Sequence, residues 1–215
     1  MRKLTKAAFR ECTSPSCGFR YPDIEITHSI VPCPCCGKNA EIIHSIDLTE
    51  SSNPSTANNV QTKNIICVLD NIRSVYNVGS LFRTMAGFGI AEAILGGITP
   101  TPLHKSFRKT SMGAEDDMHW HSVNNAYQLC QSLKDDGYHL IALETNTEAK
   151  SINLYERPDA DKSIVFIVGN EITGIDPSIL KNSDQILSIP IKGRNKSYNV
   201  TVALGIGLYA CLSIP

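Results

Sequence analysis

The sequence predicts an α/β domain with a mostly parallel sheet, preceded by a small zinc-ribbon-like module. Short apolar, strand-like runs alternate with helix-like stretches over residues 65–212, which is typical of a parallel sheet covered on both faces. Five of the eight cysteines lie between residues 12 and 36. Residues 48–63 are rich in Ser, Thr and Asn and lack a hydrophobic period, as linkers do. We therefore expect a four-cysteine zinc-ribbon-like module at 1–47, a linker at 48–63 and a main domain at 64–215.

The overall composition argues against several classes of protein. Hydrophobic residues make up 42% and charged residues 19% of the 215 residues, so the chain can bury a sizeable core. A formal net charge of −1 argues against a polybasic nucleic-acid binder, although it permits local basic patches. No apolar run approaches the roughly 20 residues that cross a bilayer. The first residues, MRKLTKAAFRE, lack the apolar stretch of a secretory signal, so we expect a cytoplasmic protein.

The cysteine cluster predicts a structural zinc site. Two pairs, Cys12 with Cys17 and Cys33 with Cys36, are each followed at once by glycine, and four thiolates satisfy a tetrahedral Zn²⁺ ion. A module of this size cannot be stabilised by core burial alone, so a metal would supply the folding energy. The alternatives are a degenerate ribbon that has lost its metal, or thiols with no joint role. Cys35 is the odd cysteine of the cluster, and the sequence leaves open whether it takes part. The remaining cysteines and two nearby histidines are expected to take no part: Cys67, Cys130, Cys211, His28 and His44.

The first half of the main domain contains three strand candidates and one helix. Residues 65–69 (IICVL) form a short apolar, β-branched run, and a polar turn at 70–77 leads into a helical stretch at 78–88. A second strand candidate, 91–95, ends in two glycines. Residues 118–123 alternate large apolar residues with histidines, which is the period of two expected of a strand.

The second half of the main domain also alternates predicted helices and strands, and it ends with an unusually apolar helix. Residues 124–136 predict a helix with one apolar face, followed by strand candidates at 139–143, 163–168 and 186–189. The final helix, 199–212, is almost wholly apolar and needs burial on every side. Two interpretations of it stay open: a central core helix, or a helix shared with a second subunit. Small residues along it permit close approach of another element: Ala203, Gly205, Gly207 and Ala210.

Polar residues gather in three segments of the main domain. The second and third segments each begin where a predicted strand ends. In the first, Asn77 and Arg83 stand at the start and in the body of the first predicted helix. Taken alone, they would be a helix cap and a solvated arginine. In the second, a buried strand runs into Gly169, Asn170 and Glu171. The carboxyl end of a strand is where open α/β sheets bind ligands.

The third segment begins where a strand ending at Ile189 enters a loop that contains glycine and lysines. Ser197 and Asn199 stand where a cap would open the final helix, and free backbone N–H groups there suit the polar edge of a cofactor. Two basic clusters accompany these segments, and taken alone they would be solvated loops. They consist of Lys105, Arg108 and Lys109, and of Lys192, Arg194 and Lys196.

The three segments resemble motifs 1, 2 and 3 of the SpoU/TrmH family of RNA methyltransferases, in the family's order. The resemblance covers residues 65–212, and although any one motif is weak, the ordered triple is specific. Residues 109–115, KTSMGAE, also resemble the family segment between motifs 1 and 2. The departures are Tyr198, where the family often has Leu, and Thr201, where it often has Ser.

The resemblance implies a SPOUT-type trefoil-knotted domain, which general rules of chain topology make improbable and no periodicity predicts. It implies a homodimer whose active site lies at the subunit interface. It also implies transfer of a methyl group from S-adenosylmethionine to a ribose 2′-OH in structured RNA, with transfer RNA favoured over ribosomal RNA. The cysteine-rich module stands where family members often carry an additional RNA-binding domain.

The resemblance also implies roles for individual residues. Arg83 would orient or activate the hydroxyl, and Asn77, Glu171, Ser197 and Asn199 would hold the site around it. RNA would be held by Arg73 together with the two basic clusters. The cofactor would contact residues on three loops: Glu144, Thr145, Val168, Gly169, Asn170, Glu171, Ile189, Ser197, Asn199 and Val200.

Two alternatives compete with this interpretation. A Rossmann-type methyltransferase should show a glycine-rich turn after its first strand, but the strand at 65–69 leads into Asp-Asn-Ile-Arg. The GxG formed by Gly205 and Gly207 lies inside the final predicted helix. A non-catalytic, zinc-containing RNA-binding or assembly protein would be expected to have lost the arginine of motif 1 or the asparagine of motif 3. Arg83 and Asn199 are both present, which favours the enzyme.

Overall fold

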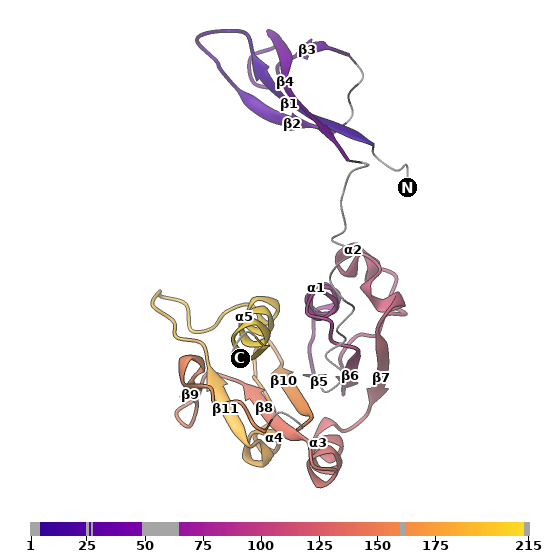
Figure 1. Cartoon of the computed structure of the whole chain (residues 1–215), viewed down its shortest axis with the longest axis vertical. Coiled ribbons are helices and arrows are strands. Elements are labelled where there is room, and N and C mark those ends of the chain that lie inside the picture. Colours follow the sequence, from indigo (N-terminus) through magenta and orange to yellow (C-terminus); the bar gives the residue numbers. More distant parts are fainter. Residues whose placement is uncertain (1–4, 25, 27, 49–64, 160–161, 213–215) are drawn as a thin grey trace. The chain divides into compact units, whose positions relative to one another are not determined.

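The computed structural model describes residues 5–24, 26, 28–48, 65–159 and 162–212. The chain divides into two compact units, Met1–Asn58 and Asn59–Pro215, and each has a sheet of its own (Figure 1). Residues 49–63 of the predicted linker lie outside the described residues. The exact domain boundaries expected from the sequence therefore stay predictions.

The N-terminal unit contains one antiparallel sheet. Its strands are β1 Lys6–Cys12, β2 Arg20–Asp23, β3 Ile30–Pro32 and β4 Asn39–Asp47. They stand in the order β2-β1-β4-β3. In the part of this unit that the structure describes, the buried hydrophobic cluster consists of Cys12, Cys33 and Ala40. A core of this size supplies little burial free energy, and two of the three residues of this cluster are candidate zinc ligands.

A buried charge helps to hold the N-terminal unit together. Arg10, on β1, is fully buried. Its guanidinium donates to Asp23 Oδ2 at 2.6 Å and to the carbonyls of Ser29 and His28 at 2.8 and 2.5 Å. Because a buried charge is tolerated only when it is paired and hydrogen-bonded, these contacts fix the segment before β3 against the sheet.

The C-terminal unit is built on a seven-stranded sheet. Its strands are β5 Ile65–Asp70, β6 Glu92–Gly96, β7 His119–Val123, β8 His139–Leu143, β9 Lys150–Ser151, β10 Ile164–Gly169 and β11 Gln185–Ser188. Their order is β7-β6-β5-β10-β8-β11-β9, and every pairing among them is parallel. Six of the seven were expected from the sequence. The seventh, β9, is two residues long and too short to show a period.

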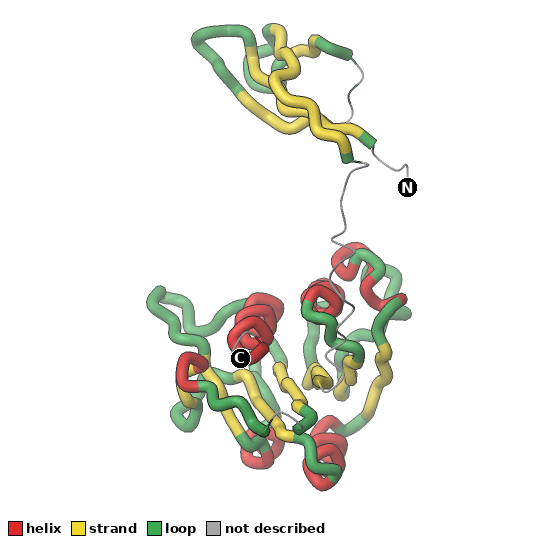
Figure 2. The backbone as a smooth tube through the Cα atoms, in the orientation of Figure 1, coloured by secondary structure: helices red, strands yellow, loops and turns green. Residues whose placement is uncertain are grey.

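Helices cover both faces of this sheet (Figures 1 and 2). They are α1 Val75–Gly87, α2 Arg108–Ser111, α3 Ala126–Asp135, α4 Pro177–Asn182 and α5 Val200–Leu212, with 3-10 turns at Ala114–Asp116 and Ile152–Leu154. On β5, Cys67 and Leu69 face the cluster that contains residues of α1 and α5. Ile66 and Val68 face the cluster that contains residues of α3 and α4. The predicted α/β class with a mostly parallel, doubly covered sheet is confirmed.

The first helix begins earlier than the sequence suggested. Ser74, and not Asn77, caps α1: the Ser74 backbone is extended, and its hydroxyl accepts from the Asn77 N–H at 3.3 Å. The predicted polar turn at 70–77 is therefore shorter than expected. Asn77 lies in the first turn of α1, so its side chain does not cap the helix and can contact other residues. A serine three residues before an asparagine competes as a cap on equal terms, which is why the pattern was ambiguous.

The last helix is not buried on every side. Leu204, Leu208 and Cys211 are buried where α5 packs on α1, β8 and β10. Val202 and Tyr209, in contrast, are 48% and 66% exposed. Of the two interpretations left open by the sequence, a helix wholly enclosed by its own chain does not fit, because an apolar face of α5 stays exposed; burial against a second subunit stays a prediction. None of the helices among the described residues is both long and apolar enough to span a membrane.

Candidate active site and metal centre

A pocket of about 340 Å³ lies at the carboxyl ends of β8, β10 and β11, beside the start of α5. All ten residues expected to contact a cofactor line it. Parallel strands place their carboxyl ends at one edge of the sheet, which is the usual position of ligand sites in this class. The rest of the lining was not predicted from the sequence: Leu143, Ile172, Gly174, Leu187, Tyr198 and Ala203.

Bare backbone shapes the β10 side of the pocket. A Cβ on Gly169 would overlap the Ile175 nitrogen, so the absence of a side chain lets the turn that follows fold directly against the strand end. Asn170 and Gly174 close this turn with reciprocal backbone hydrogen bonds of 3.1 and 2.9 Å, and Gly174 has a φ of +72°, which glycine adopts without strain. The spacing Gly-Asn-Glu-x-x-Gly was the signal from which Gly174 could have been predicted.

Glu171 joins the second segment to the first. Its carboxylate accepts from the backbone N–H groups of Arg73 and Ser74 at 2.9 and 3.1 Å, and from Asn77 Nδ2 at 2.8 Å. Partial burial raises the pKa of the Glu171 carboxyl. The hydrogen bonds from Arg73, Asn77 and Ser74 outweigh burial and hold that pKa below its ordinary value. The group therefore stays ionised at neutral pH and anchors the start of α1.

Asn199 brings the third segment into the same network. Its Nδ2 donates to Asn77 Oδ1 at 3.3 Å, while its Oδ1 accepts from the Thr201 N–H at 2.8 Å and from the Thr201 hydroxyl at 2.6 Å. Asn199 thus stands at the opening of α5, as the sequence predicted. One chain of contacts, from Glu171 through Asn77 to Asn199, links all three segments at the edge of the pocket.

Arg83 and Ser197 are placed differently from the rest of the predicted catalytic set. Ser197 lines the pocket and is exposed. Arg83 is exposed on α1 and is not among the residues that line the pocket of its own chain. Within the described part of the chain, the side chain of Arg83 makes no ion pair or hydrogen bond. Its guanidinium is therefore available to an external partner.

Of the predicted RNA-contacting residues, one is held by its own chain. Arg108 Nε lies 2.9 Å from Glu115 Oε1, and its terminal nitrogen contacts Asp116. Arg108 and Lys109 also belong to the short helix α2 and not to a loop as expected. The remaining basic residues of this set are exposed: Arg73, Lys105, Lys109, Lys192, Arg194 and Lys196.

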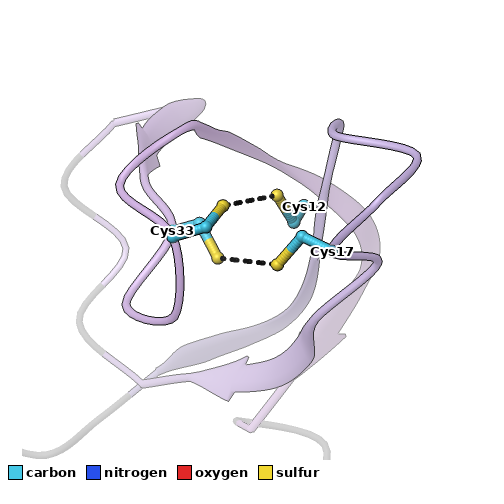
Figure 3. A group of neighbouring side chains, drawn as sticks. Cys12, Cys17 and Cys33 are labelled. Carbon is cyan, nitrogen blue, oxygen red and sulfur yellow. Dashed lines mark hydrogen bonds between the residues drawn. The ribbon is translucent and has the colours of Figure 1, made fainter.

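In the N-terminal unit, the four predicted zinc ligands converge. The Sγ atoms of Cys12, Cys17, Cys33 and Cys36 all lie within 4.8 Å of one another. The Sγ atoms of Cys12 and Cys36 are 3.5 Å apart, and those of Cys17 and Cys33 are 3.9 Å apart. Figure 3 shows the thiols of Cys12 and Cys17 turned toward the loop that carries Cys33. A tetrahedral Zn²⁺ with Zn–S bonds of about 2.3 Å requires sulfurs about 3.8 Å apart. The donor set and its spacing therefore fit zinc.

The environment of Cys33 also suits a metal ligand. Burial raises the pKa of the Cys33 thiol, but hydrogen bonds from the backbone N–H groups of Cys36 and Cys35 outweigh burial and lower that pKa to about 7. A hydrogen bond from the backbone of Ser14 lowers the pKa of the Cys12 thiol, but burial and the neighbouring thiols outweigh it and raise that pKa to about 12, so the four thiols share the negative charge unequally. The thiolate is the form that binds metal. Cys35 is exposed and donates its N–H to Cys33 Sγ at 3.4 Å, so it supports the cluster through its backbone and is outside the group of four converging thiols.

Comparison with known proteins decides the family. The model of the SpoU rRNA Methylase family matches residues 64–209, which is more than half of the chain and includes all three segments. The chain belongs to the SpoU family. A curated relative from Mycoplasma genitalium, named an uncharacterized tRNA/rRNA methyltransferase, is 33% identical to this SpoU member over 145 residues, covering 67% of this chain and 59% of the relative.

A second relative, the tRNA (guanosine(18)-2′-O)-methyltransferase of Borreliella burgdorferi, is 29% identical over 154 residues, covering 72% of this chain and 68% of the relative. The chain thus spans about three fifths to two thirds of the length of these two proteins. Among solved structures, the A. aeolicus TrmH/SpoU tRNA modifying enzyme matches with a TM-score of 0.63 and 26% identity, over 70% of this chain and 75% of that one. An AdoMet-bound rRNA methyltransferase from Sinorhizobium meliloti matches with a TM-score of 0.65 and 23% identity, over 70% and 56%. The latter shows that the fold is shared.

Proposed function

We propose that this SpoU-family protein transfers a methyl group from S-adenosylmethionine to the ribose 2′-OH of a nucleotide in structured RNA. The observation that carries the proposal is the contact chain from Glu171 through Asn77 to Asn199. Three segments that are far apart in the sequence meet through it at one pocket. A network of this kind holds a site rigid before its ligands arrive, as efficient catalysis requires.

The pocket suits the proposed cofactor. Its volume of about 340 Å³ lies within the range of small-molecule sites. Its lining combines apolar side chains with exposed backbone at Gly169 and Asn170 and with the polar side chains of Thr145 and Ser197. We infer that the apolar part holds the adenine and that the polar groups hold the ribose and the amino-acid end. When bound, S-adenosylmethionine supplies an electrophilic methyl group.

In this proposal Arg83 binds the ribose hydroxyl and a neighbouring phosphate. Its planar guanidinium can hold two oxygens at once, which aligns the nucleophile. With a pKa of roughly 12.5–13.8 an arginine is a poor base in water, so we assign it an orienting role. The hydroxyl proton then leaves to the phosphate or to solvent.

The active site is proposed to be completed by a second subunit. Arg83 lies outside the pocket lining of its own chain. Val202 and Tyr209 are exposed on α5, the helix whose first residues line that pocket. A homodimer through the exposed face of α5 would bury these side chains and could bring the Arg83 of one subunit to the pocket of the other. Such a face on a monomer is typical of an interaction site.

We favour transfer RNA over ribosomal RNA as the substrate. The name of the Borreliella burgdorferi relative, which specifies 2′-O-methylation of a transfer RNA, supports both the substrate and the ribose as the target. The exposed basic residues at 192, 194 and 196 lie in the loop of the third segment, where they could contact the RNA backbone. The N-terminal unit, with zinc held by its four thiols, would add a second RNA contact.

One experiment tests the activity directly. The full chain is incubated with S-adenosylmethionine carrying a labelled methyl group and with total transfer RNA or ribosomal RNA. A 2′-O-methyl group removes the hydroxyl that attacks the phosphodiester, so a ribose-methylated nucleotide resists alkaline hydrolysis. We expect labelled, alkali-resistant dinucleotides from transfer RNA. Label that is released as ordinary mononucleotides would place the methyl group on a base and contradict the proposed target.

A further inference from the structure

We propose that Glu144 is a specificity-determining residue that makes the pocket prefer cationic S-adenosylmethionine to neutral S-adenosylhomocysteine, its demethylated product. The inference rests on the proposed function and adds a charge preference to it. The two molecules differ by one methyl group and one unit of positive charge. The pocket therefore distinguishes them mainly through the charge of its lining.

The charges of the lining are all of one sign. Among the described residues that line the pocket, Glu144 and Glu171 carry carboxylates, and none is a lysine, an arginine or a histidine. Neither carboxylate forms an ion pair with a basic side chain in the described part of the chain. A cleft lined by charge of one sign attracts a ligand of the opposite sign.

The two carboxylates have different amounts of free hydrogen-bonding capacity. Glu171 accepts three hydrogen bonds from the start of α1, and its role is to hold that helix. Glu144 accepts one bond on each oxygen, from the Thr145 N–H at 2.8 Å and the Ile175 N–H at 2.9 Å. Because a carboxylate oxygen offers two lone pairs, both oxygens of Glu144 keep capacity for a ligand.

The chain is built to hold the Glu144 carboxylate in this position. A Cβ on Gly174 would overlap Glu144 Oε2 at its present position, so the carboxylate lies directly against the turn after β10. The hydrogen bonds from Thr145 and Ile175 come from two different loops. The carboxylate is thus fixed between the β8 and β10 loops and cannot move away from a ligand without breaking both contacts.

The preference can be measured by binding alone. Isothermal titration of the full-length protein is carried out with S-adenosylmethionine, with S-adenosylhomocysteine and with sinefungin, which carries an ammonium in place of the sulfonium. Coulomb's law between water and a partly buried site gives an effect on the order of tenfold. We expect both cationic ligands to bind about tenfold more tightly than S-adenosylhomocysteine, and the difference to shrink when the salt concentration is raised.

The variant Glu144→Gln keeps the shape and removes the charge. We expect it to reduce the preference for the cationic ligands to about twofold, chiefly by weakening their binding. The matched control is Glu148→Gln, which removes the same charge from an exposed side chain outside the lining and should leave the preference unchanged. Thermal unfolding of both variants shows whether the fold is intact.

Each outcome decides a separate question. Binding of S-adenosylhomocysteine as tight as that of S-adenosylmethionine in the wild type overturns the charge preference and leaves the proposed function standing. An unchanged preference in a folded Glu144→Gln variant removes Glu144 as its source. If Glu144→Gln does not fold, the ranking of the three ligands and its salt dependence in the wild type still decide whether the pocket selects charge. Failure of all three ligands to bind the wild type contradicts the proposed function itself.

Discussion

Two polar side chains of the site, Arg83 and Glu171, are held to very different degrees. Glu171 is fixed by three donors from the start of α1, whereas Arg83 makes no contact of this kind with the described chain. A residue that anchors the site should affect stability when it is changed. A residue whose side chain contacts only the RNA should, when it is changed, affect turnover and not stability.

Arg83→Ala should lower the rate of methyl transfer by at least about 100-fold while leaving S-adenosylmethionine affinity within about twofold. An interaction made mainly in the transition state is lost from turnover and not from ground-state binding. Arg83→Lys should restore little, because an ammonium cannot reproduce the planar fork of a guanidinium. Single-turnover methylation and calorimetry with the cofactor measure the two effects. Near-normal turnover of Arg83→Ala, or a defect explained entirely by lost cofactor binding, would contradict the assigned role.

Glu171→Gln should destabilise the C-terminal unit by about 1 kcal/mol at pH 7, because a neutral amide accepts weaker hydrogen bonds from Arg73, Ser74 and Asn77. The folded pKa of Glu171 is lowered, so its contribution is present above the unfolded pKa of about 4.3 and is lost as the pH falls through the folded value. The stabilities of wild type and variant, measured by urea unfolding, should therefore converge as the pH falls through the lowered folded pKa. The exposed Glu148→Gln serves as control. A difference that stays constant over the whole acid titration would show that the ionised carboxylate is not the cause.

At the residue scale, the motif pattern was enough to select Asn77, Glu171 and Asn199, but not to show how they act. The cap at Ser74 and the carboxylate of Glu144 were not assigned their roles, because both depend on which backbone N–H groups lie within about 3 Å in the folded chain. Sequence spacing does not contain that information.

At the scale of elements, α5 both borders the pocket and presents an exposed apolar face. Its first residue follows Asn199 at the pocket, and its exposed face carries Val202 and Tyr209. Uniform apolar composition predicted complete burial of the helix. The structure shows burial on one face only, since α1, β8 and β10 lie on that side.

Tyr209→Glu should weaken the proposed dimer at least tenfold, because it would place a charge in an apolar interface without a partner. Sedimentation equilibrium at micromolar concentration measures the change. The control is Leu103→Glu, which alters a side chain that is 85% exposed in the loop between β6 and α2 and should leave association unchanged. A wild-type protein that sediments only as a monomer would contradict the dimer, and an unaffected Tyr209→Glu dimer would place the interface elsewhere.

At the scale of the whole molecule, the chain joins a unit with almost no apolar core to one with two extensive buried clusters. The small unit should depend on its metal, whereas the large one should not. Domain organisation of this kind lets one part be removed while the other keeps its fold.

The purified protein should contain about one zinc ion per chain, and Cys33→Ser should lose it. Elemental analysis under reducing, chelator-free conditions measures the metal. The matched change Cys35→Ser should retain zinc, because Cys35 lies outside the converging set. Absence of zinc from the wild type, or its retention in Cys33→Ser, would contradict the site.

Removal of residues 1–50 should weaken RNA binding about tenfold while leaving S-adenosylmethionine affinity unchanged. The pocket is lined entirely by residues of the C-terminal unit, so the truncation touches none of its contacts. Filter binding with transfer RNA and calorimetry with the cofactor separate the two effects. Loss of cofactor binding on truncation would show that the two-domain division is wrong.

Local patterns in the chain were sufficient to predict the α/β class, six of the seven strands of the main sheet and the four converging cysteines. Each of these follows from period, spacing and composition within a few residues. Tertiary structure alone established that Glu171 meets Asn77 across 94 residues and that Asn199 meets Asn77 across 122. It alone showed that one face of α5 stays open. Both depend on strand order and on which elements pack together, which global burial decides and no local stretch of sequence encodes.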